Sequence, residues 1–401
     1  MSEHPQLPAL QLKKREERRL RAGHLWVYSN EVDTQKTPLK DFEPGQAARV
    51  LASNGDLLGT GYVNPQSLIC ARLLNTLNSK PADTAFLEQR IRTALALRER
   101  VYSEPYYRMV YAESDLLPGL VVDRYNDVLV VQITTAGMDV LRDSIIEALN
   151  AVVSPAGILL RNDGSMRALE GLDSYVEKIG NVPDELIVVE DGLQYNVSIA
   201  QGQKTGWFYD QRDNRRKLSR YVKDARVLDV FSYAGGWGLH AANYGAREVV
   251  CVDASEDAVN RITANAQLNN FADRVSALQG DAFDCLRELR DSQQRFDVIV
   301  LDPPAFIKRR KDEKAGLQAY RRINELAMGL LADDGILVSA SCSFHLEESA
   351  LQKVLTQSAQ HARKNLQILE RGRQGVDHPV HPAMPETEYL KALFCRLYSA
   401  G

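Results

Sequence analysis

Residues Arg226–Gly238 read RVLDVFSYAGGWG, an apolar run that breaks into three glycines before a helical pattern resumes at Leu239. The pattern predicts a strand, a tight turn and a helix. Glycines at such a turn let the backbone approach a ligand closely, and the first turn of a helix presents unpaired N–H groups. The stretch therefore predicts a ligand site whose edge is main chain, at the glycines Gly235, Gly236 and Gly238.

A carboxylate follows this turn at a sequence separation that is typical of nucleoside-binding sites. Asp253 ends the apolar run 248–252, about 20 residues after the turn, where an acidic side chain commonly binds ribose hydroxyls. The glycines are spaced G-G-x-G, whereas a dinucleotide pyrophosphate calls for G-x-G-x-x-G. The two features together predict a nucleoside site and disfavour a dinucleotide.

Two further apolar runs also end in acidic residues. Asp281 follows Gly280, and Asp302 opens the sequence Asp-Pro-Pro-Ala-Phe at 302–306. Any one of these aspartates could simply cap the following helix. Their order along alternating strands and helices instead predicts a parallel α/β sheet with a ligand at the carboxyl ends of its strands.

Bulk properties bound the remaining choices. A chain of 401 residues predicts about two or three domains, and its net charge of −4 indicates no global affinity for polyanions. Its five cysteines include no C-x-x-C pair, which argues against a metal site and fits a reducing cytoplasm. No apolar run is long enough to span a bilayer. We expect a cytoplasmic protein with no membrane partner.

Residues 1–76 are predicted to form a small β-barrel. Strand-like runs at 47–52, 57–63 and 67–74 alternate with turns, and Asn54-Gly55 is a strong hairpin signal. This order resembles the PUA domain, an RNA-binding module.

A basic segment, Lys13–Arg21, precedes the aromatic residues Trp26 and Tyr28. This composition suits phosphate contacts and base stacking. A solvated turn beside a small core explains it equally well.

The rest of the chain divides in two. Residues 77–185 predict an α+β domain, with a helix capped by Asp83 or Thr84 and another over Met138–Val152. Residues 186–401 begin with a hairpin over Leu186–Ile199 and contain the glycine turn. We expect this last part to hold the chemistry.

The segment Gly202–Arg215 lies just before the glycine turn and is dense in polar and aromatic side chains. Such a segment can fold over a bound cofactor and exclude water. A helix capped by Asp210 is the alternative for its second half, but that alternative leaves Lys204 and Thr205 unexplained.

Cys342 follows an apolar run, 335–341, at a predicted junction between strand and helix. Helix N–H groups there would lower the thiol pKa and favour the nucleophilic thiolate. Cys251 lies within a strand and is predicted to be an inert packing residue. We therefore predict Cys342 as a nucleophile, with His345 as a candidate proton acceptor unless it only caps a helix or faces solvent.

The motifs FSYAGGWG, CVDAS, DPPAF and SCSFH, preceded by GQKTGWFYDQRDNR, resemble the bacterial 23S ribosomal RNA 5-methylcytosine methyltransferases. The resemblance runs from about Gly23 to Tyr398 and implies a class I, Rossmann-like methyltransferase domain after the PUA-like barrel and the α+β domain. Relatives usually carry Thr at the position of Ala234 and often Phe at that of Trp237. The cofactor implied is S-adenosylmethionine, with no metal. The implied binding residues are Lys204, Thr205, Gln211, Phe231, Ser232, Gly235, Asp253, Ala254, Asp281, Ala282 and Asp302.

The same resemblance implies a mechanism with Cys342 and Asp302 as catalytic residues. The thiolate would add to carbon 6 of cytosine in 23S ribosomal RNA, and Asp302 would hydrogen-bond the base. A homodimer is an open alternative to a monomer. Two other functions stay open: N-methylation of guanine or adenine, which often places an aromatic where this chain has Ala305, and RNA binding without catalysis.

Overall fold

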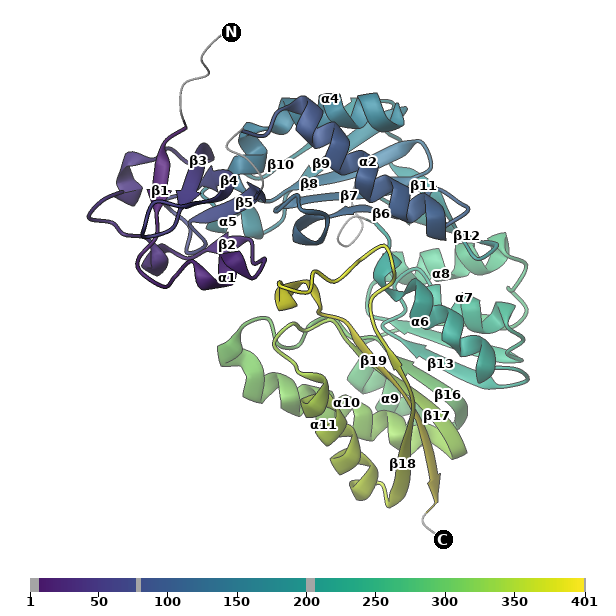
Figure 1. Cartoon of the computed structure of the whole chain (residues 1–401). Helices are drawn as coiled ribbons and strands as arrows, with labels where there is room; N and C mark the ends of the chain where they lie inside the picture. Colours follow the sequence, from purple (N-terminus) through teal and green to yellow (C-terminus); the bar gives the residue numbers. More distant parts are fainter. Residues whose placement is uncertain (1–6, 77–80, 200–205, 400–401) are drawn as a thin grey trace. The chain divides into compact units, whose positions relative to one another are not determined.

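The computed structural model describes residues 7–76, 81–199 and 206–399 (Figure 1). The chain divides into two compact units. The first comprises Met1–Asp184 and Val376–Thr387, and the second comprises Glu185–Gly375 and Glu388–Gly401. A segment from near the carboxyl end is thus part of the first unit. The bounds of the three predicted domains stay a prediction.

A five-stranded sheet builds the amino-terminal part of the first unit, in the order β1-β3-β4-β5-β2. Its strands are β1 (Ala9–Gln11), β2 (Trp26–Val27), β3 (Gln46–Leu51), β4 (Leu57–Val63) and β5 (Ala71–Asn75). The predicted hairpin between β3 and β4 is confirmed, with Gly55 at a φ of 93°. The predicted strand at 67–74 is wrong at its start, because a backbone hydrogen bond from Asn64 to Cys70 (2.8 Å) closes a turn before β5.

The basic segment lies around the short helix α1 (Arg18–Arg21). Lys13, Lys14 and Arg15 are exposed, and Arg19 forms an ion pair with Glu31 at 2.6 Å. The exposed charges leave the predicted contact with RNA phosphates open as a prediction.

A second five-stranded sheet forms the rest of the first unit, in the order β10-β9-β8-β7-β6. Helices α2 (Thr84–Val101) and α4 (Arg142–Val153) share one core with it. The predicted cap of α2 is confirmed, since Asp83 accepts a hydrogen bond from the Phe86 N–H at 2.8 Å. The single helix predicted over Met138–Val152 is wrong, because the chain leaves helical geometry at Leu141. The remaining elements are β6 (Tyr106–Tyr111), β7 (Leu120–Tyr125), β8 (Val128–Ile133), β9 (Gly157–Asn162), β10 (Tyr175–Gly180), α3 (Ala136–Val140) and α5 (Met166–Leu169).

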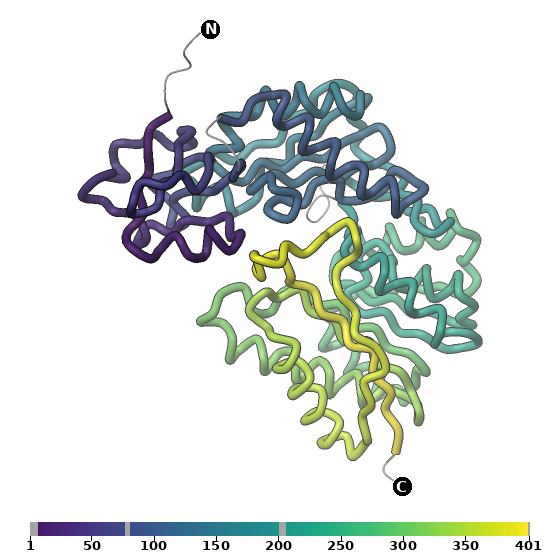
Figure 2. The backbone as a smooth tube through the Cα atoms, in the orientation of Figure 1, coloured from purple at the N-terminus to yellow at the C-terminus, as the bar shows by residue number. Residues whose placement is uncertain are grey.

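The segment Val376–Thr387 lies in the chain between the last two strands, near the carboxyl end (Figure 2), and belongs to the first unit. Arg98 donates to the Asp377 carbonyl at 2.7 Å, and the Asp377 carboxylate accepts from the Arg108 N–H at 2.9 Å. Met384 is fully buried among the side chains of the first sheet. These contacts give the segment a structural role in the first unit.

The second unit is built on a seven-stranded sheet in the order β15-β14-β13-β16-β17-β19-β18. The first five strands in that order are parallel, and β19 pairs antiparallel with both β17 and β18. The strands are β13 (Arg226–Val230), β14 (Glu248–Asp253), β15 (Val275–Gln279), β16 (Phe296–Leu301), β17 (Leu331–Ser341), β18 (Lys364–Gly372) and β19 (Lys391–Ser399). The predicted parallel α/β sheet is therefore confirmed.

Helices alternate with these strands. Helices α9 (Ala282–Asp291), α10 (Glu313–Leu330) and α11 (Glu348–His361) share one apolar core with the sheet. Helices α7 (Gly236–Asn243) and α8 (Glu256–Leu268) pack against β14 and the hairpin strand β12 (Leu193–Ser198), which pairs with β11 (Glu185–Glu190). Within the described ranges, no helix combines the length and apolar character needed to cross a membrane.

Candidate cofactor-binding and catalytic site

The carboxyl ends of the parallel strands in the second unit surround a cavity of about 440 Å³. The predicted site residues that line it come from six separate segments of the unit. They are Gln211, Phe231, Ser232, Asp253, Ala254, Asp281, Ala282, Asp302 and Cys342. Gly235 lies one residue before the lining residue Gly236, and Lys204 and Thr205 lie outside the described residues. The structure thus brings most of the predicted set together, while the role of each residue stays a prediction.

The glycine turn after β13 has an unusual backbone. Phe231, Tyr233 and Gly235 all have positive φ values, of 69°, 53° and 84°. Such values are costly for residues with a Cβ and concentrate at functional sites. A Cβ at Gly235 would lie 2.5 Å from a Leu239 carbon, and one at Gly238 would lie 2.4 Å from the Cys251 sulfur. Both glycines are therefore needed for the turn to pack against helix and sheet.

Asp253 is oriented by the glycine turn itself. Its Oδ2 accepts a hydrogen bond from the Tyr233 N–H at 2.9 Å, and its Oδ1 accepts from the Ser255 N–H at 3.0 Å. Each carboxylate oxygen has two lone pairs, so both can still accept a hydroxyl hydrogen. This arrangement suits the paired hydroxyls of a ribose.

Asp281 combines both of the roles weighed from the sequence. Its Oδ1 caps α9 by accepting from the N–H groups of Phe283 and Asp284, at 2.9 and 3.3 Å. The residue also lines the cavity. A helix cap and a ligand contact are therefore compatible here.

Asp302 is held by two donors from different elements. Gln211 Nε2 lies 3.0 Å from each carboxylate oxygen, and the Trp237 indole N–H donates to Oδ2 at 3.0 Å. Gln211 is fixed in turn by Asn214, whose Nδ2 donates to Oε1 at 2.7 Å. Trp237 was noted in the sequence only as a departure from Phe, and its contact with Asp302 was missed. The need of a buried indole N–H for a hydrogen-bond acceptor is the signal that could have suggested this contact.

The hairpin before the glycine turn supplies a buried charge network. Glu190 pairs with Arg215 at 2.6 Å and accepts from the Trp207 indole at 2.9 Å. Burial alone would raise the Glu190 pKa, but Arg215, His240 and Arg212 outweigh burial and lower it. The network fixes Trp207 and Arg215, both of which line the cavity.

A helix capped by Asp210, the alternative weighed for this segment, is not what the structure shows. Helix α6 (Arg212–Lys217) follows a 3₁₀ turn, its N-cap is Gln211, and no side chain caps it. The Asp210 carboxylate instead accepts a hydrogen bond from the Tyr389 hydroxyl. Asp210 lines the cavity rather than serving as a cap.

Cys342 follows the last residue of β17 and is partly exposed, whereas the other four cysteines are buried. The helix expected at this point begins only at Glu348, because residues 343–347 form an intervening turn. Tyr320 and Lys391 hold this turn: the Tyr320 hydroxyl lies 2.9 Å from Ser343 Oγ, and Lys391 Nζ donates to the Ser343 carbonyl at 2.8 Å. The predicted junction between strand and helix is confirmed, but residues 343–347 separate Cys342 from α11, so the predicted effect of helix N–H groups on the thiol stays a prediction.

His345 does not reach the cavity. Its side chain is exposed, and its ring lies edge to face with that of Phe344, with ring centroids 5.4 Å apart. Exposure to solvent, which we weighed as an alternative to a role as proton acceptor, is therefore what the structure shows for His345.

Asp229, within β13, is a buried carboxyl group that the sequence analysis did not single out. Its Oδ2 accepts from the Gly238 N–H at 2.9 Å, so it ties the strand to the first turn of α7. Burial raises the Asp229 pKa to about 7, and the charges of Asp302 and Asp253 act in the same direction.

The raised pKa predicts how stability changes with pH. Between the unfolded value of 3.8 and about 7, the folded state binds more protons at Asp229 than the unfolded state does, so this group makes stability fall as pH rises. The slope from this group is about 1.4 kcal/mol per pH unit at most. Asp229→Asn should flatten this fall in urea unfolding between pH 5 and 8, whereas Asp273→Asn, at an exposed aspartate, should not. Equal slopes in the two variants would mean that Asp229 is ionised in both states.

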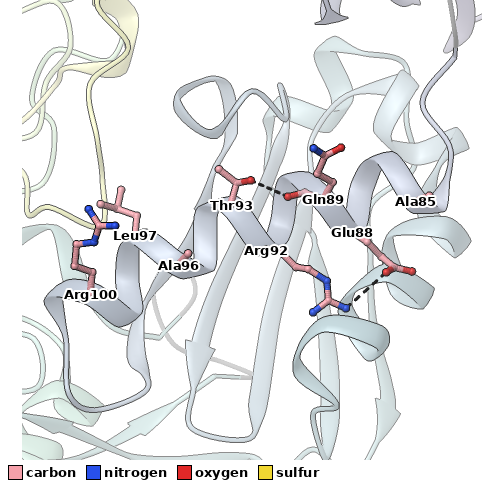
Figure 3. Close-up of a pocket in the computed structure, with 8 residues that line it drawn as sticks. All are labelled: Ala85, Glu88, Gln89, Arg92, Thr93, Ala96, Leu97 and Arg100. Atoms are coloured by element: carbon pink, nitrogen blue, oxygen red, sulfur yellow. Dashed lines mark hydrogen bonds and ion pairs between the residues drawn. The ribbon is translucent and has the colours of Figure 1, made fainter.

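A larger hollow, of about 700 Å³, lies along one face of α2 in the first unit (Figure 3). Its polar side chains pair along the helix, with Arg92 lying 3.7 Å from Glu88 and Thr93 donating to the Gln89 carbonyl at 2.9 Å. Because this hollow gathers side chains from one helix only, the smaller cavity is the better candidate for the functional site.

A parallel sheet whose strand ends bring a glycine turn, a ribose-type carboxylate and further aspartates to one cavity defines a class I S-adenosylmethionine-dependent methyltransferase. Residues 163–396 match the family model described as S-adenosylmethionine-dependent methyltransferase, and residues 10–76 match that of the PUA-like domain. S-adenosylmethionine is the cofactor of this class. The chain belongs to the ribosomal RNA large subunit methyltransferase I family.

Family membership rests on relatives similar over nearly their whole length. Ribosomal RNA large subunit methyltransferase I of Aliivibrio fischeri strain MJ11 is 36% identical over 395 residues, which cover 97% of this chain and 99% of the relative. The protein of the same name from Tolumonas auensis is 38% identical over 392 residues, covering 96% and 98%.

Solved structures agree with the fold. SMU.776, crystallised in complex with SAH, superposes with a TM-score of 0.83 at 20% identity, covering 97% of this chain and 100% of that chain. A SAM-dependent methyltransferase from Streptococcus mutans superposes with a TM-score of 0.82 at 20% identity, with the same coverage. At this identity the likeness shows the fold alone.

Proposed function

We propose that the protein forms 5-methylcytosine in 23S ribosomal RNA, through a covalent adduct between the base and Cys342. The observation that carries the proposal is that the one partly exposed cysteine, Cys342, lines the same cavity as Asp253, Asp281 and Asp302. The name shared by the relatives supports ribosomal RNA as substrate, and the PUA-like domain supports RNA binding.

The chemistry explains why a cysteine belongs in this cavity. Carbon 5 of cytosine is a weak nucleophile, and addition of the Cys342 thiolate to carbon 6 makes carbon 5 enamine-like. S-adenosylmethionine would supply the electrophilic methyl group that carbon 5 then takes up, and S-adenosylhomocysteine would leave. Loss of the proton from carbon 5 and departure of the thiolate release the product and restore Cys342.

Asp302 suits recognition of cytosine. Its carboxylate is an acceptor, and the amino group of cytosine is the donor that carboxylates read in nucleic acids. Gln211 and Trp237 hold this carboxylate in one orientation at the cavity wall. The target base must leave its stack to reach the cavity, so we expect a loop or an unpaired segment as substrate.

The alternative of N-methylation finds less support. Ala305 stands directly after the two prolines, and the next residue, Phe306, packs against the Tyr320 ring with centroids 4.8 Å apart. Phe306 is therefore engaged in the protein and does not line the cavity. A scaffold without catalysis would have no need for a partly exposed cysteine beside the cofactor cavity.

The product of the reaction tests the proposal. Unmodified large-subunit RNA, both free and in assembled subunits, is incubated with the protein and S-adenosylmethionine carrying an isotopically labelled methyl group, then digested to nucleosides for mass spectrometry. We expect labelled 5-methylcytidine. Label on guanosine or adenosine would favour the N-methyltransferase, and absence of label from both substrates would favour the binding scaffold.

We place this reaction in the cytoplasm, where a reducing environment keeps Cys342 available as a thiol. Homodimer formation stays a prediction, and sedimentation of the purified protein over a range of concentrations would test it.

A further inference from the structure

A buried lysine contacts the backbone on both sides of Cys342. Lys391 begins β19, and its partner in the antiparallel register with β17 is Ser341, the residue before Cys342. Its Nζ donates to the carbonyl of Ser343, the residue after Cys342, at 2.8 Å. Lys391 thus contacts the residues on both sides of Cys342 and is only 8% exposed.

The charges around Lys391 indicate what balances its ammonium group. Burial lowers the Lys391 pKa to about 8, the charge of Cys342 raises it, Arg373 lowers it, and Glu388 and Glu348 raise it. Among the described residues, no carboxylate lies within ion-pair distance of Lys391. Glu348 and Glu388 both pair with Arg373 instead.

A buried ammonium group normally has an anionic partner, because an unpaired charge loses its hydration without compensation. The Cys342 thiolate is the anion that the geometry offers. Lys391 does not line the cavity, so it has no direct path to a base or a methyl group there.

We propose that Lys391 is a positioning residue whose buried ammonium group stabilises the Cys342 thiolate and holds the backbone on both sides of Cys342, so that the sulfur is directed into the cavity. The effect on the thiol is independent of the substrate, whereas its consequence for methyl transfer rests on the function proposed above. When the thiol ionises, its proton passes to solvent and Lys391 remains protonated. The stabilisation is therefore present below about pH 8 and is lost as pH rises and Lys391 becomes neutral.

Alkylation of the folded, full-length protein with iodoacetamide measures this effect, because only Cys342 is partly exposed. The rate is followed against pH by mass spectrometry of the peptide that contains Cys342. In the wild type we expect a midpoint below that of a free thiol, about 8.5. Lys391→Met should raise the midpoint by about one pH unit, so that alkylation at pH 7 slows about tenfold. Lys391→Arg should keep most of the wild-type rate.

Lys364→Met is the matched control. Lys364 is also a partly buried lysine of this sheet, and its Nζ donates to the carbonyls of Leu331 and Ala332 at 3.2 and 3.3 Å. It should leave the Cys342 midpoint unchanged. A wild-type midpoint at or above that of a free thiol, or an equal midpoint in Lys391→Met and Lys364→Met, would overturn the proposal. The midpoint of the wild type tests the proposal even if Lys391→Met fails to fold.

The catalytic consequence is measured separately. Lys391→Met should lower kcat for methyl transfer about tenfold at pH 7 and less at pH 9, with little change in the KM for S-adenosylmethionine. A shifted alkylation midpoint without any 5-methylcytosine would reject the proposed function and keep the role of Lys391. Formation of 5-methylcytosine with an unshifted alkylation midpoint would reject the role of Lys391 and keep the proposed function.

Discussion

Cys342→Ala is expected to lower methyl transfer to RNA by at least about a thousandfold, because it removes the nucleophile on which the proposed reaction depends. Affinity for S-adenosylmethionine, measured by calorimetry, should stay close to that of the wild type, since the cofactor contacts proposed here come from Asp253 and the glycine turn. Loss of turnover with binding retained would separate a chemical role for Cys342 from a structural one.

A mechanism-based trap tests the role of Cys342 as nucleophile in a second way. In RNA that carries 5-fluorocytosine, fluorine replaces the proton that must leave carbon 5, so methylation can proceed but elimination cannot. The wild type should remain covalently attached to this RNA on a denaturing gel, and Cys342→Ala should not. Cys395→Ala is the control, because Cys395 is fully buried within β19 and should leave trapping intact. Full methylation by Cys342→Ala would falsify the nucleophile assignment and favour the N-methyltransferase.

Asp253→Ala is expected to weaken S-adenosylmethionine binding by at least about a hundredfold. Hydrogen bonds to a charged group contribute about 1.5–3 kcal/mol each, and the carboxylate is placed to accept from two ribose hydroxyls. The change also removes the acceptors of the Tyr233 and Ser255 N–H groups, so some of the loss will come from the glycine turn.

Two further variants separate these contributions. Asp253→Asn keeps an acceptor for the Tyr233 N–H but loses the charge, and its affinity should fall between those of Asp253→Ala and the wild type. Asp257→Ala removes an exposed aspartate four residues further on and should leave affinity unchanged. An unchanged calorimetric affinity in folded Asp253→Ala would place the ribose elsewhere.

Patterns of near neighbours in the chain were enough to predict the parallel sheet of the second unit, the hairpin at Asn54-Gly55 and the cap at Asp83. Each depends on residues a few positions apart: apolar alternation, a residue pair that tolerates positive φ, or a side chain that reaches its own helix. The strand-end order of Asp253, Asp281 and Asp302 was equally visible, because parallel strands bring their carboxyl ends to one edge. The sequence by itself therefore determined the class of fold and most of the cavity wall.

Local sequence patterns did not predict where a helix is interrupted or which unit a connecting segment belongs to. The helix predicted over Met138–Val152 divides at Leu141, and Val376–Thr387, between the last two strands, packs in the first unit. His345 was a candidate base because it follows Cys342 closely, yet the turn between strand and helix directs it into solvent. Nearness in sequence says little about direction once the chain leaves regular structure.

Only the tertiary structure determined the pKa values and the orientations of the charged side chains at the site. Asp229 acquires its raised pKa from burial within the sheet, and Asp302 acquires its orientation from Gln211 and Trp237, which are distant in sequence. Lys391 lies beside Cys342 because β19 enters the sheet antiparallel to β17, in a register that pairs Lys391 with Ser341. The pattern that predicts a strand lies within a short segment of the sequence. The protonation of a buried group depends instead on every element packed around it, and only the assembled sheet brings those elements together.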